Sequence, residues 1–261
     1  MRRPGSNWAW SARLALLLSC AALVACQGAA QTSGQSSGQS DQVPGQLVFP
    51  QAERPVSSIV STQWSTENER DLHKEAASVM DLAGVVPGMS VADIGAGEGY
   101  YTVRLAGRVG AKGRVLAQDI DARALSRLGA RAERERLAAI SIVQGTPDDP
   151  RLPENSFDRI FMIHMYHEVA QPYAFLWRIW PALKDGGHIV VVDLDRPSDH
   201  HGITPALLTC EFAAAGFRLS AFRPILGNPG YYAQFTKTTQ RRPEPGEMKP
   251  CRAGDGAAAK G

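Results

Sequence analysis

The chain has 261 residues, of which 44% are hydrophobic and 21% charged, and its formal net charge is +2. This length fits one domain with a sizeable core and little more. The apolar and charged fractions are ordinary for a soluble α/β protein, and no sustained basic run is present, which disfavours nucleic acid as a partner.

The first 25 residues differ in kind from the rest. Arg2, Arg3 and Arg13 precede an apolar run from Leu14 to Ala25. About a dozen apolar residues suit the central region of a signal peptide, whereas a membrane-spanning helix needs roughly twenty. We therefore predict a signal peptide over residues 1–25 and expect the protein to be exported.

The apolar run ends in LVAC, Leu23 to Cys26, which resembles the lipobox of bacterial lipoproteins. In that motif the cysteine thiol is lipidated and becomes the new N-terminus. LLSC, ending at Cys20, is a second match, but cleavage there would leave a short apolar region and an apolar start to the mature chain. An ordinary signal peptide with two chance cysteines is the alternative. The Gln-, Ser- and Gly-rich segment Gln27–Gln46 favours the lipoprotein, because it cannot bury apolar area and is typical of a flexible tether.

We therefore expect residues 26–60 to consist of the lipidated Cys26 followed by a flexible linker. The lipid anchor is the only contact with a membrane that we expect. Gln27 stands where an aspartate commonly retains lipoproteins at the inner membrane. The resemblance therefore implies the periplasmic face of the outer membrane. Removing residues 1–25 deletes three arginines and no acid, which takes the formal charge from +2 to about −1. The mature domain is near neutral, so nothing electrostatic draws it to anionic partners.

From about Trp64 to Lys237 the pattern alternates between strand and helix. The expected helices cover residues 66–84, 100–109, 122–137, 172–183 and 204–216, and the expected strands cover residues 87–95, 113–120, 139–145, 156–165, 187–194, 217–222 and 231–235. Ser65 or Thr66 is the expected cap of the first helix.

Continuous apolar runs are typical of strands buried on both faces, in a parallel sheet with helices on either side. The last two strands flank an Asn-Pro-Gly turn signal, so we expect them to be antiparallel. The predicted fold over residues 61–238 is α/β: a doubly wound, Rossmann-like, mostly parallel seven-strand sheet with a C-terminal antiparallel hairpin.

Two further cysteines, Cys210 and Cys251, remain in the mature chain. They could pair in an oxidising periplasm. Cys210 falls in an expected helix, however, which favours a small buried residue over a bridge. Residues 239–261 are rich in Pro, Gly and Ala, and we predict a disordered tail.

The stretch VADIGAGEGYYTVRLA, residues 91–106, places Asp93 at the end of a strand and glycines at 95, 97 and 99 before a helix. A dinucleotide fingerprint needs its third glycine one position later, and a phosphate-binding P-loop needs a Gly-Lys-Ser/Thr that does not follow. Glu98 would repel a pyrophosphate at the helix N-terminus. The loop therefore favours a cationic ligand and disfavours a nicotinamide-dependent dehydrogenase.

This stretch resembles the first motif of the class I, seven-strand S-adenosylmethionine-dependent methyltransferases. The resemblance covers residues 66–238 and includes LPENSFDRIF, residues 152–161, and WPALKDGGHIVVVD, residues 180–193. It implies S-adenosylmethionine as the cofactor and a small molecule as the substrate. An Asn-Pro-Pro-Tyr-like motif of DNA adenine methyltransferases is absent after the fourth strand, which argues against a nucleobase amine as the acceptor.

The resemblance also assigns residues to the cofactor. The loop of Gly95, Gly97 and Gly99 receives its aminoacyl end, with Asp93 beside it. Asp119, at the end of the second strand, binds both ribose hydroxyls, since a carboxylate accepts two hydrogen bonds at once. A tight turn without a ligand is the alternative for the glycines. A helix cap is the alternative for Asp119, and Asp121 competes for that role.

The sequence departs from the family after the third strand. The family usually places an acid there, near the adenine amino group, but this chain has Thr146. Asp148 is the nearest substitute. Two assignments stay open for it: an adenine contact, or a turn residue beside Pro147 and Pro150.

In this family the transferable methyl lies over the carboxyl end of the fourth strand. There the chain has His164, Tyr166, His167 and Glu168, any of which could supply a base or a hydrogen-bond donor. His167 is the first choice as base because an imidazole titrates near neutral pH. A histidine held structurally at a helix start, by Glu168 or by backbone, is the alternative. Two histidines offer too few ligands at useful spacing, so no metal is predicted.

A second polar cluster, Asp199 to His201, follows the fifth strand with Asp193 and Asp195 nearby. It either lines the mouth of a substrate site or forms a solvated loop. Tyr100 and Tyr101 open the helix after the glycine loop, where one of them faces the cofactor or both pack under the sheet.

Together these features predict an exported, lipid-anchored methyltransferase acting on an unidentified small-molecule acceptor. The alternative is a non-catalytic ligand-binding or scaffolding lipoprotein that keeps the fold, because a fold alone does not establish activity. S-adenosylmethionine is made in the cytoplasm, and a charged molecule does not cross a bilayer unaided. Three alternatives follow: the cofactor is delivered, the mature domain binds another ligand, or the N-terminus is not used as a signal. The arginines, the apolar run and the Gln27–Gln46 segment together favour export.

Overall fold

A computed structural model of the chain describes residues 47–59, 66–225, 230–238 and 241–252. Several predictions lie outside the described residues: the predicted signal peptide, lipidation of Cys26, the predicted tether Gln27–Gln46, the alternative cap Ser65 and the Asn-Pro turn signal before Gly230. Within the described ranges, no helix combines the length and the apolar character that crossing a bilayer requires.

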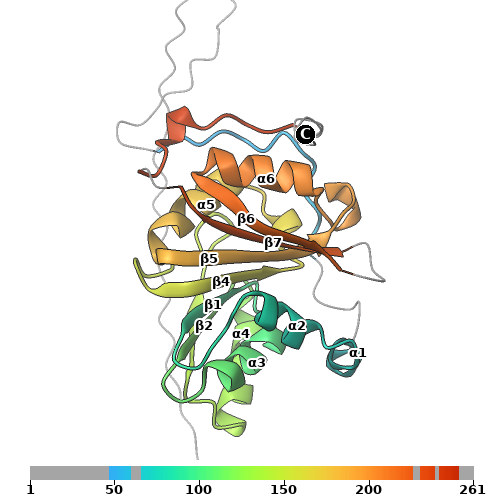
Figure 1. Cartoon of the computed structure of the whole chain (residues 1–261), viewed down its shortest axis with the longest axis vertical. Coiled ribbons are helices and arrows are strands. Elements are labelled where there is room, and N and C mark those ends of the chain that lie inside the picture. Colours follow the sequence, from blue (N-terminus) through green and yellow to red (C-terminus); the bar gives the residue numbers. More distant parts are fainter. Residues whose placement is uncertain (1–46, 60–65, 226–229, 239–240, 253–261) are drawn as a thin grey trace, which may run out of the picture. The chain divides into compact units, whose positions relative to one another are not determined.

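A seven-stranded sheet forms the centre of the domain, in the order β3-β2-β1-β4-β5-β7-β6 (Figure 1). The strands are β1 (Ser90–Ile94), β2 (Arg114–Asp119), β3 (Ile140–Gln144), β4 (Phe157–Ile163), β5 (Leu183–Leu194), β6 (Phe217–Pro224) and β7 (Gly230–Lys237). The first five strands are parallel, and β7 runs antiparallel to both β5 and β6. The predicted fold class, including the antiparallel C-terminal hairpin, is confirmed.

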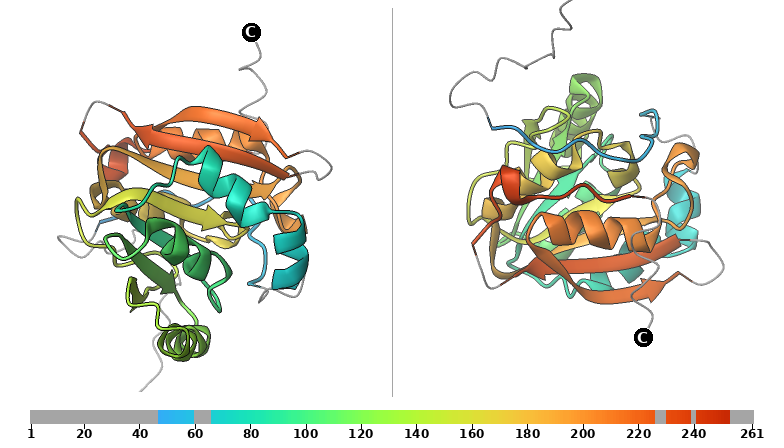
Figure 2. Two further views of the ribbon diagram at one scale, coloured as in Figure 1. Left: turned by 60° about the horizontal axis from the view of Figure 1, so that its bottom comes forward. Right: turned by 90° about the horizontal axis from the view of Figure 1, so that it is seen from above.

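Helices cover both faces of this sheet (Figure 2). The described helices are α1 (Glu67–Leu72), α2 (Glu75–Leu82), α3 (Tyr100–Val109), α4 (Ala122–Arg134), α5 (Pro172–Ile179) and α6 (Pro205–Ala214), with short 3₁₀ turns η1 (Tyr166–Glu168), η2 (Trp180–Ala182), η3 (Ser198–His200) and η4 (Pro245–Glu247). Val91 packs with α2 and α3, whereas its neighbour Ala92 packs with α5 and α6. Successive strand residues point to opposite faces, so the apolar run in β1 serves two cores.

The helix predicted over residues 66–84 is in fact two helices. Thr66 caps α1 in a capping box with Glu69, which confirms the predicted cap. Lys74 then adopts a left-handed conformation with φ of 54°, so the chain turns before α2 begins. Neither His73 nor Lys74 is a helix breaker by residue type, so the sequence carries no signal for this interruption.

The structure corrects the predictions of a linker up to residue 60 and of a disordered tail. Residues 47–59 and 241–252 pack on the domain and lie side by side near α6, joined by a bridge between Glu53 and Arg252 (Figures 1 and 2). We call residues 47–59 the N-terminal segment. The domain is therefore longer at both ends than residues 61–238.

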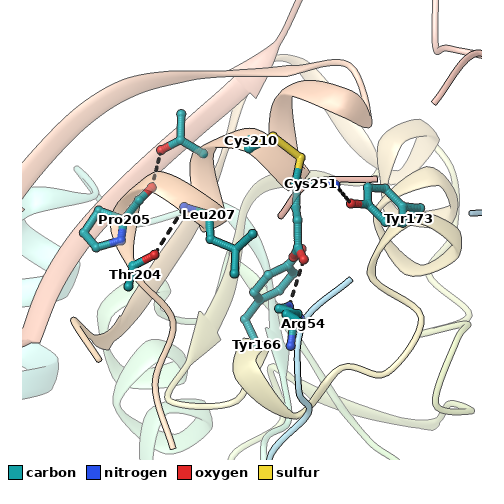
Figure 3. The surroundings of a disulfide bond; sticks show 10 residues. Arg54, Tyr166, Tyr173, Thr204, Pro205, Leu207, Cys210 and Cys251 are labelled. Carbon is teal, nitrogen blue, oxygen red and sulfur yellow. Dashed lines mark hydrogen bonds and ion pairs between the residues drawn. A yellow bond between two sulfur atoms is a disulfide. The ribbon is translucent and has the colours of Figure 1, made fainter. Parts of the chain in front are cut away.

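A disulfide fastens the C-terminal part of the chain to α6. Cys210 and Cys251 are bonded at an S–S distance of 2.03 Å, and the Cys251 N–H donates to the Tyr173 hydroxyl at 2.6 Å (Figure 3). The preference for Cys210 as an unbridged buried residue was therefore wrong. A helix position does not forbid a disulfide when the partner lies on a segment packed beside the helix, and that packing was not predicted.

A buried ion pair holds the N-terminal segment. Arg54 Nε donates to Glu211 Oε1 at 2.8 Å, and both side chains are fully buried. Tyr166 donates its hydroxyl to the other carboxylate oxygen at 2.8 Å. The remaining guanidinium nitrogens donate to the carbonyls of His167 and Val169 (Figure 3 shows Arg54 beside Tyr166). Arg54 thereby fixes the turn η1, which follows β4.

Candidate active site

The loop between β1 and α3 is built from three glycines that all have positive φ: 69° at Gly95, 54° at Gly97 and 92° at Gly99. Residues with a side chain adopt this region at a cost of roughly 1–2 kcal/mol, which explains the choice of glycine. A Cβ at Gly95 would lie 2.9 Å from Met165 Cγ, and one at Gly99 would clash with Leu128. At Gly97 such an atom would meet nothing within 4 Å. Gly97 is therefore the member of the loop that borders open space.

Asp119 ends β2 beside this loop. One of its carboxylate oxygens accepts the Gly97 N–H at 2.8 Å, and the other accepts the Asp121 N–H at 2.9 Å. The cap of α4 is Asp121, whose side chain accepts the Arg123 N–H. The structure thus gives the capping role to Asp121 and leaves Asp119 on the glycine loop, where the resemblance expects it.

A pocket of about 290 Å³ opens above the loop, close to the lower end of the roughly 300–1,000 Å³ typical of small-molecule sites. Its lining comprises the glycine loop residues Gly95 to Glu98, together with Asp93, Thr66, Glu67, Arg70, Tyr100, Tyr101 and Ile163. The structure thus brings Asp93, Gly95 and Gly97 together around one space. Gly99 contributes through its packing on α4.

Acidic and aromatic groups dominate the chemistry of this pocket. Asp93 is 3% exposed and accepts a hydrogen bond from Thr102 Oγ1 at 2.6 Å. Burial raises the pKa of Asp93 to about 6, so a cation arriving beside it would favour the ionised form. Tyr100 and Tyr101 both line the pocket and pack in the core, with hydroxyls that donate to Asp71 and Glu75. The surroundings suit a cationic ligand.

Asp148 lies outside the lining of this pocket. Its carboxylate accepts from Arg178 at 2.9 Å and from Thr146 Oγ1 at 2.9 Å. These contacts tie down the loop between β3 and β4, and they favour the turn assignment over the adenine contact.

The residues after β4 separate into different roles. Tyr166 is fully buried and its hydroxyl is bonded to Glu211, which gives it a structural role and corrects its place among the catalytic candidates. His164 has φ of 54° and lies 3.4 Å from Glu75 Oε1 through its Nε2. Burial opposes ionisation of Glu75, but hydrogen bonds from His164 and Arg70 hold its pKa well below the usual value.

His167 is oriented by Asp193 and not by Glu168. Its Nδ1 lies 2.9 and 3.0 Å from the two carboxylate oxygens of Asp193, a buried residue near the end of β5. An ionised carboxylate only accepts hydrogen bonds, so Nδ1 of His167 is the donor in this contact and Nε2 is the ring nitrogen that points away from Asp193. The role of His167 as a base stays a prediction. The structure also brings His201 and Glu168 to His167, with one ligand atom of each within 4.8 Å of the others.

Sequence reasoning missed several contributors. It gave no role to Arg70, which lines the pocket with its guanidinium carbon 3.8 Å from the Tyr100 ring centroid. The pairing of His167 with Asp193 had a usable signal, because both follow neighbouring parallel strands whose carboxyl ends meet at one edge. Nothing in the sequence signalled the role of Arg54, because its segment was predicted to be part of a linker.

Comparison with known proteins places this architecture. Residues 92–191 match the family model of a methyltransferase domain. The chain is 31% identical over 120 residues to the ubiquinone/menaquinone biosynthesis C-methyltransferase UbiE of Shewanella sp. strain ANA-3, covering 45% of this chain and 47% of that enzyme. The UbiE of Azotobacter vinelandii is 28% identical over 188 residues, which cover 68% of this chain and 69% of that enzyme. The chain thus spans about half the length of the first of these relatives.

Among solved structures, a SAM-dependent methyltransferase from Aquifex aeolicus is similar with a TM-score of 0.58 and 20% sequence identity, covering 66% of this chain and 98% of that one. This likeness shows the fold. Residues 92–191 thus match a methyltransferase domain model, and the fold of the chain is the one found in SAM-dependent methyltransferases.

Proposed function

We propose that the protein is an S-adenosylmethionine-dependent methyltransferase that acts on a small-molecule acceptor. The observation that carries the proposal is the open space at Gly97, which Asp93 lines and beside which Asp119, outside the pocket lining, accepts the Gly97 N–H. When bound, S-adenosylmethionine supplies an electrophilic methyl group on a positively charged sulfur. The matched relatives are named C-methyltransferases, which supports the reaction class, while the acceptor of this chain stays unidentified.

The residues of the pocket have distinct tasks in this proposal. Asp119 accepts hydrogen bonds from the ribose hydroxyls while it holds the Gly97 N–H. Asp93 pairs with the ammonium group of the aminoacyl end, and Gly97 leaves room for the ligand. On the acceptor side, Asp193 orients His167 so that its Nε2 lone pair can receive a proton or bind an electron-poor centre.

Calorimetric titration with S-adenosylhomocysteine and with NAD tests the cofactor assignment. We expect the full-length protein to bind the former and not the latter. Asp119→Ala should weaken binding by about 1.5–3 kcal/mol, as for a lost charge-assisted hydrogen-bonding group, whereas the cap variant Asp121→Ala should bind almost as the wild type does. Equal affinity in the wild type and in Asp119→Ala would overturn the assignment.

Turnover tests the acceptor side once a methyl acceptor is found by screening with radiolabelled methyl donor. His167→Ala should lower turnover and leave the affinity for S-adenosylhomocysteine nearly intact. A variant that loses stability but keeps its activity per folded molecule would make His167 structural. Cofactor binding with no turnover on any acceptor would favour the non-catalytic alternative.

We further propose that the protein is exported and anchored by lipid at Cys26, on the periplasmic face of the outer membrane. The order of arginines, apolar run, LVAC and Gln27–Gln46 supports this proposal. The Cys210–Cys251 disulfide also supports it, since disulfides persist in oxidising compartments. In that compartment the cofactor must be delivered to the pocket.

A further inference from the structure

His167, Glu168 and His201 meet although His201 lies far along the chain from the other two. One ligand atom from each side chain lies within 4.8 Å of the others. His167 and Glu168 belong to η1, which follows β4, and His201 follows η3, which comes after the adjacent strand β5. The carboxyl ends of parallel strands lie at one edge of a sheet, so the fold itself brings these donors together.

A buried carboxylate lies behind this group. Asp193 is fully buried, and in the described part of the chain its one ion-pair partner is His167. The Leu194 N–H also donates to Asp193 at 2.8 Å, so the carboxylate is held by hydrogen bonds from two sides. A cation bound at the far ring nitrogen of His167 would place positive charge close to this buried carboxylate. Histidines that bind metals commonly donate their second ring N–H to a carboxylate in this way.

The backbone around the group is held in place from outside. His201 has φ of 54°, a region that costs free energy for a residue with a side chain. Its N–H donates to Ser57 Oγ at 3.2 Å, and the Ser57 hydroxyl in turn donates to the carbonyl of Ser198. The Ser57 N–H donates to the carbonyl of His167 at 3.3 Å. One residue of the N-terminal segment thus ties together the two loops that carry the three donors.

We propose that His167, Glu168 and His201 bind a divalent first-row transition metal ion, with Asp193 as the hydrogen-bonding partner of His167. Two imidazoles and one carboxylate are a donor set that zinc uses in catalytic sites, where a further position stays open. The carboxylates of Glu168 and Asp193 balance the charge of the ion. Donor atoms that bind zinc at 2.0–2.2 Å are roughly 3.3–3.6 Å apart, so the group contracts by about 1 Å on binding. Glu168 and His201 are only half-buried and can make that adjustment.

The position of the group suggests what the ion does, and this step rests on the proposed function. A Cβ on Gly95 would lie 2.9 Å from Met165 Cγ, so the chain just before His167 packs against the glycine loop. A metal ion with an open position would bind the oxygen, nitrogen or sulfur atom of the acceptor and lower its pKa, with the released proton passing to water. His167 then serves as a ligand and not as the base.

Metal binding can be measured without a known substrate. The full-length chain, free of purification tags and with Cys20 and Cys26 replaced by Ser, is stripped with chelator and titrated with Zn²⁺ in a calorimeter. The bound metal is then counted by mass spectrometry after dialysis. Glu168→Gln replaces the charged carboxylate donor by a neutral amide, and His201→Asn removes the imidazole donor. His200→Asn is the matched control, because His200 is the exposed neighbour of His201 and lies outside the group.

We expect one equivalent of zinc in the wild type and in His200→Asn. The affinity for Zn²⁺ should fall at least 10-fold in Glu168→Gln and in His201→Asn. It should fall 10- to 100-fold in Asp193→Asn, which alters only the residue that hydrogen-bonds to the ligand His167. Far-UV circular dichroism and titration with S-adenosylhomocysteine show that each variant is folded. A wild type that binds no zinc, or donor variants that bind it as His200→Asn does, would overturn the proposal. A wild type that binds zinc but no S-adenosylhomocysteine would instead overturn the proposed function alone.

Discussion

At the scale of single residues, Gly97 and Gly88 form a natural comparison. Both have positive φ, 54° and 90°, and in both cases an added Cβ would meet nothing within 4 Å. Only Gly97 lines the pocket. Alanine at either position should therefore cost a similar backbone strain of roughly 1–2 kcal/mol.

The two variants should differ in ligand binding. Gly97→Ala should lose affinity for S-adenosylhomocysteine because the methyl group occupies ligand space, while Gly88→Ala should bind as the wild type does. Thermal unfolding measures the strain and calorimetry the affinity. If both variants bind equally well, the space at Gly97 is not the cofactor site.

Asp93 makes cofactor binding dependent on pH. Because burial raises its pKa to about 6, Asp93 is protonated in the free protein at pH 5 and ionised at pH 7.5. The ammonium of the aminoacyl group binds the ionised form better, so the affinity for S-adenosylhomocysteine should increase as the pH rises through about 6, with release of a proton on binding below that value.

Titrations in buffers of different ionisation enthalpy measure that proton directly. Asp93→Asn is the control and should remove both the slope in this range and the released proton. The same slope in Asp93→Asn would show that another group is responsible.

At the scale of elements, the N-terminal segment depends on one buried ion pair. In the wild type both side chains of the pair are fully buried. Glu211→Gln keeps the shape of the side chain but leaves the buried Arg54 guanidinium without a counter-charge. We expect a loss of about 3–5 kcal/mol in the free energy of unfolding, measured with urea. The same substitution at Glu98, whose pair with Arg127 is more than half exposed, should cost about 0–1 kcal/mol. If both variants lost a similar free energy of unfolding, the buried pair would not be the main interaction that stabilises the N-terminal segment.

Elements whose signal is local could be predicted from the sequence. Continuous apolar runs identified β1, β4 and β5, and the Thr66 cap and the Pro172 start of α5 follow from residue type. The break at Lys74 and the packing of the terminal segments could not be predicted. They depend on contacts with distant parts of the chain, such as that between Arg54 and Glu211, and composition carries no record of such contacts.

The residues of the candidate site also fall into those with a local sequence signal and those without one. Gly95, Gly97 and Asp119 could be predicted to lie together because the family motif is continuous in sequence and its backbone needs are specific, and their role toward a cofactor stays a prediction. Tyr166 was misassigned because its neighbours in sequence are polar, while its true surroundings are the buried ion pair of Arg54. The approach of His201 to His167 needs the register of two adjacent strands, which periodicity alone does not give.

At the scale of the whole molecule, the proposed anchor predicts a defined pattern of lipid labelling. Cells that express the wild type and are fed a palmitate analogue should show label on the protein and place it in the membrane fraction. Cys26→Ser should carry no label, whereas Cys20→Ser should be labelled as the wild type is, because LLSC is the weaker match. An unlabelled, full-length, cytosolic wild type would overturn the anchor and place the domain beside the cytoplasmic supply of cofactor.

The contact between Arg54 and Glu211 joins positions 157 residues apart, and this separation has a consequence for the order of folding. A ribosome has already made β1 to β5 before residue 211 emerges, and Arg54 has no partner for its charge until then. The Cys210–Cys251 bond closes later still. The nascent chain therefore stays incompletely folded until synthesis is nearly finished. Under the proposed export, a translocation channel that accepts only unfolded chains would meet the protein in that state, and the contacts that complete the domain would form after translocation.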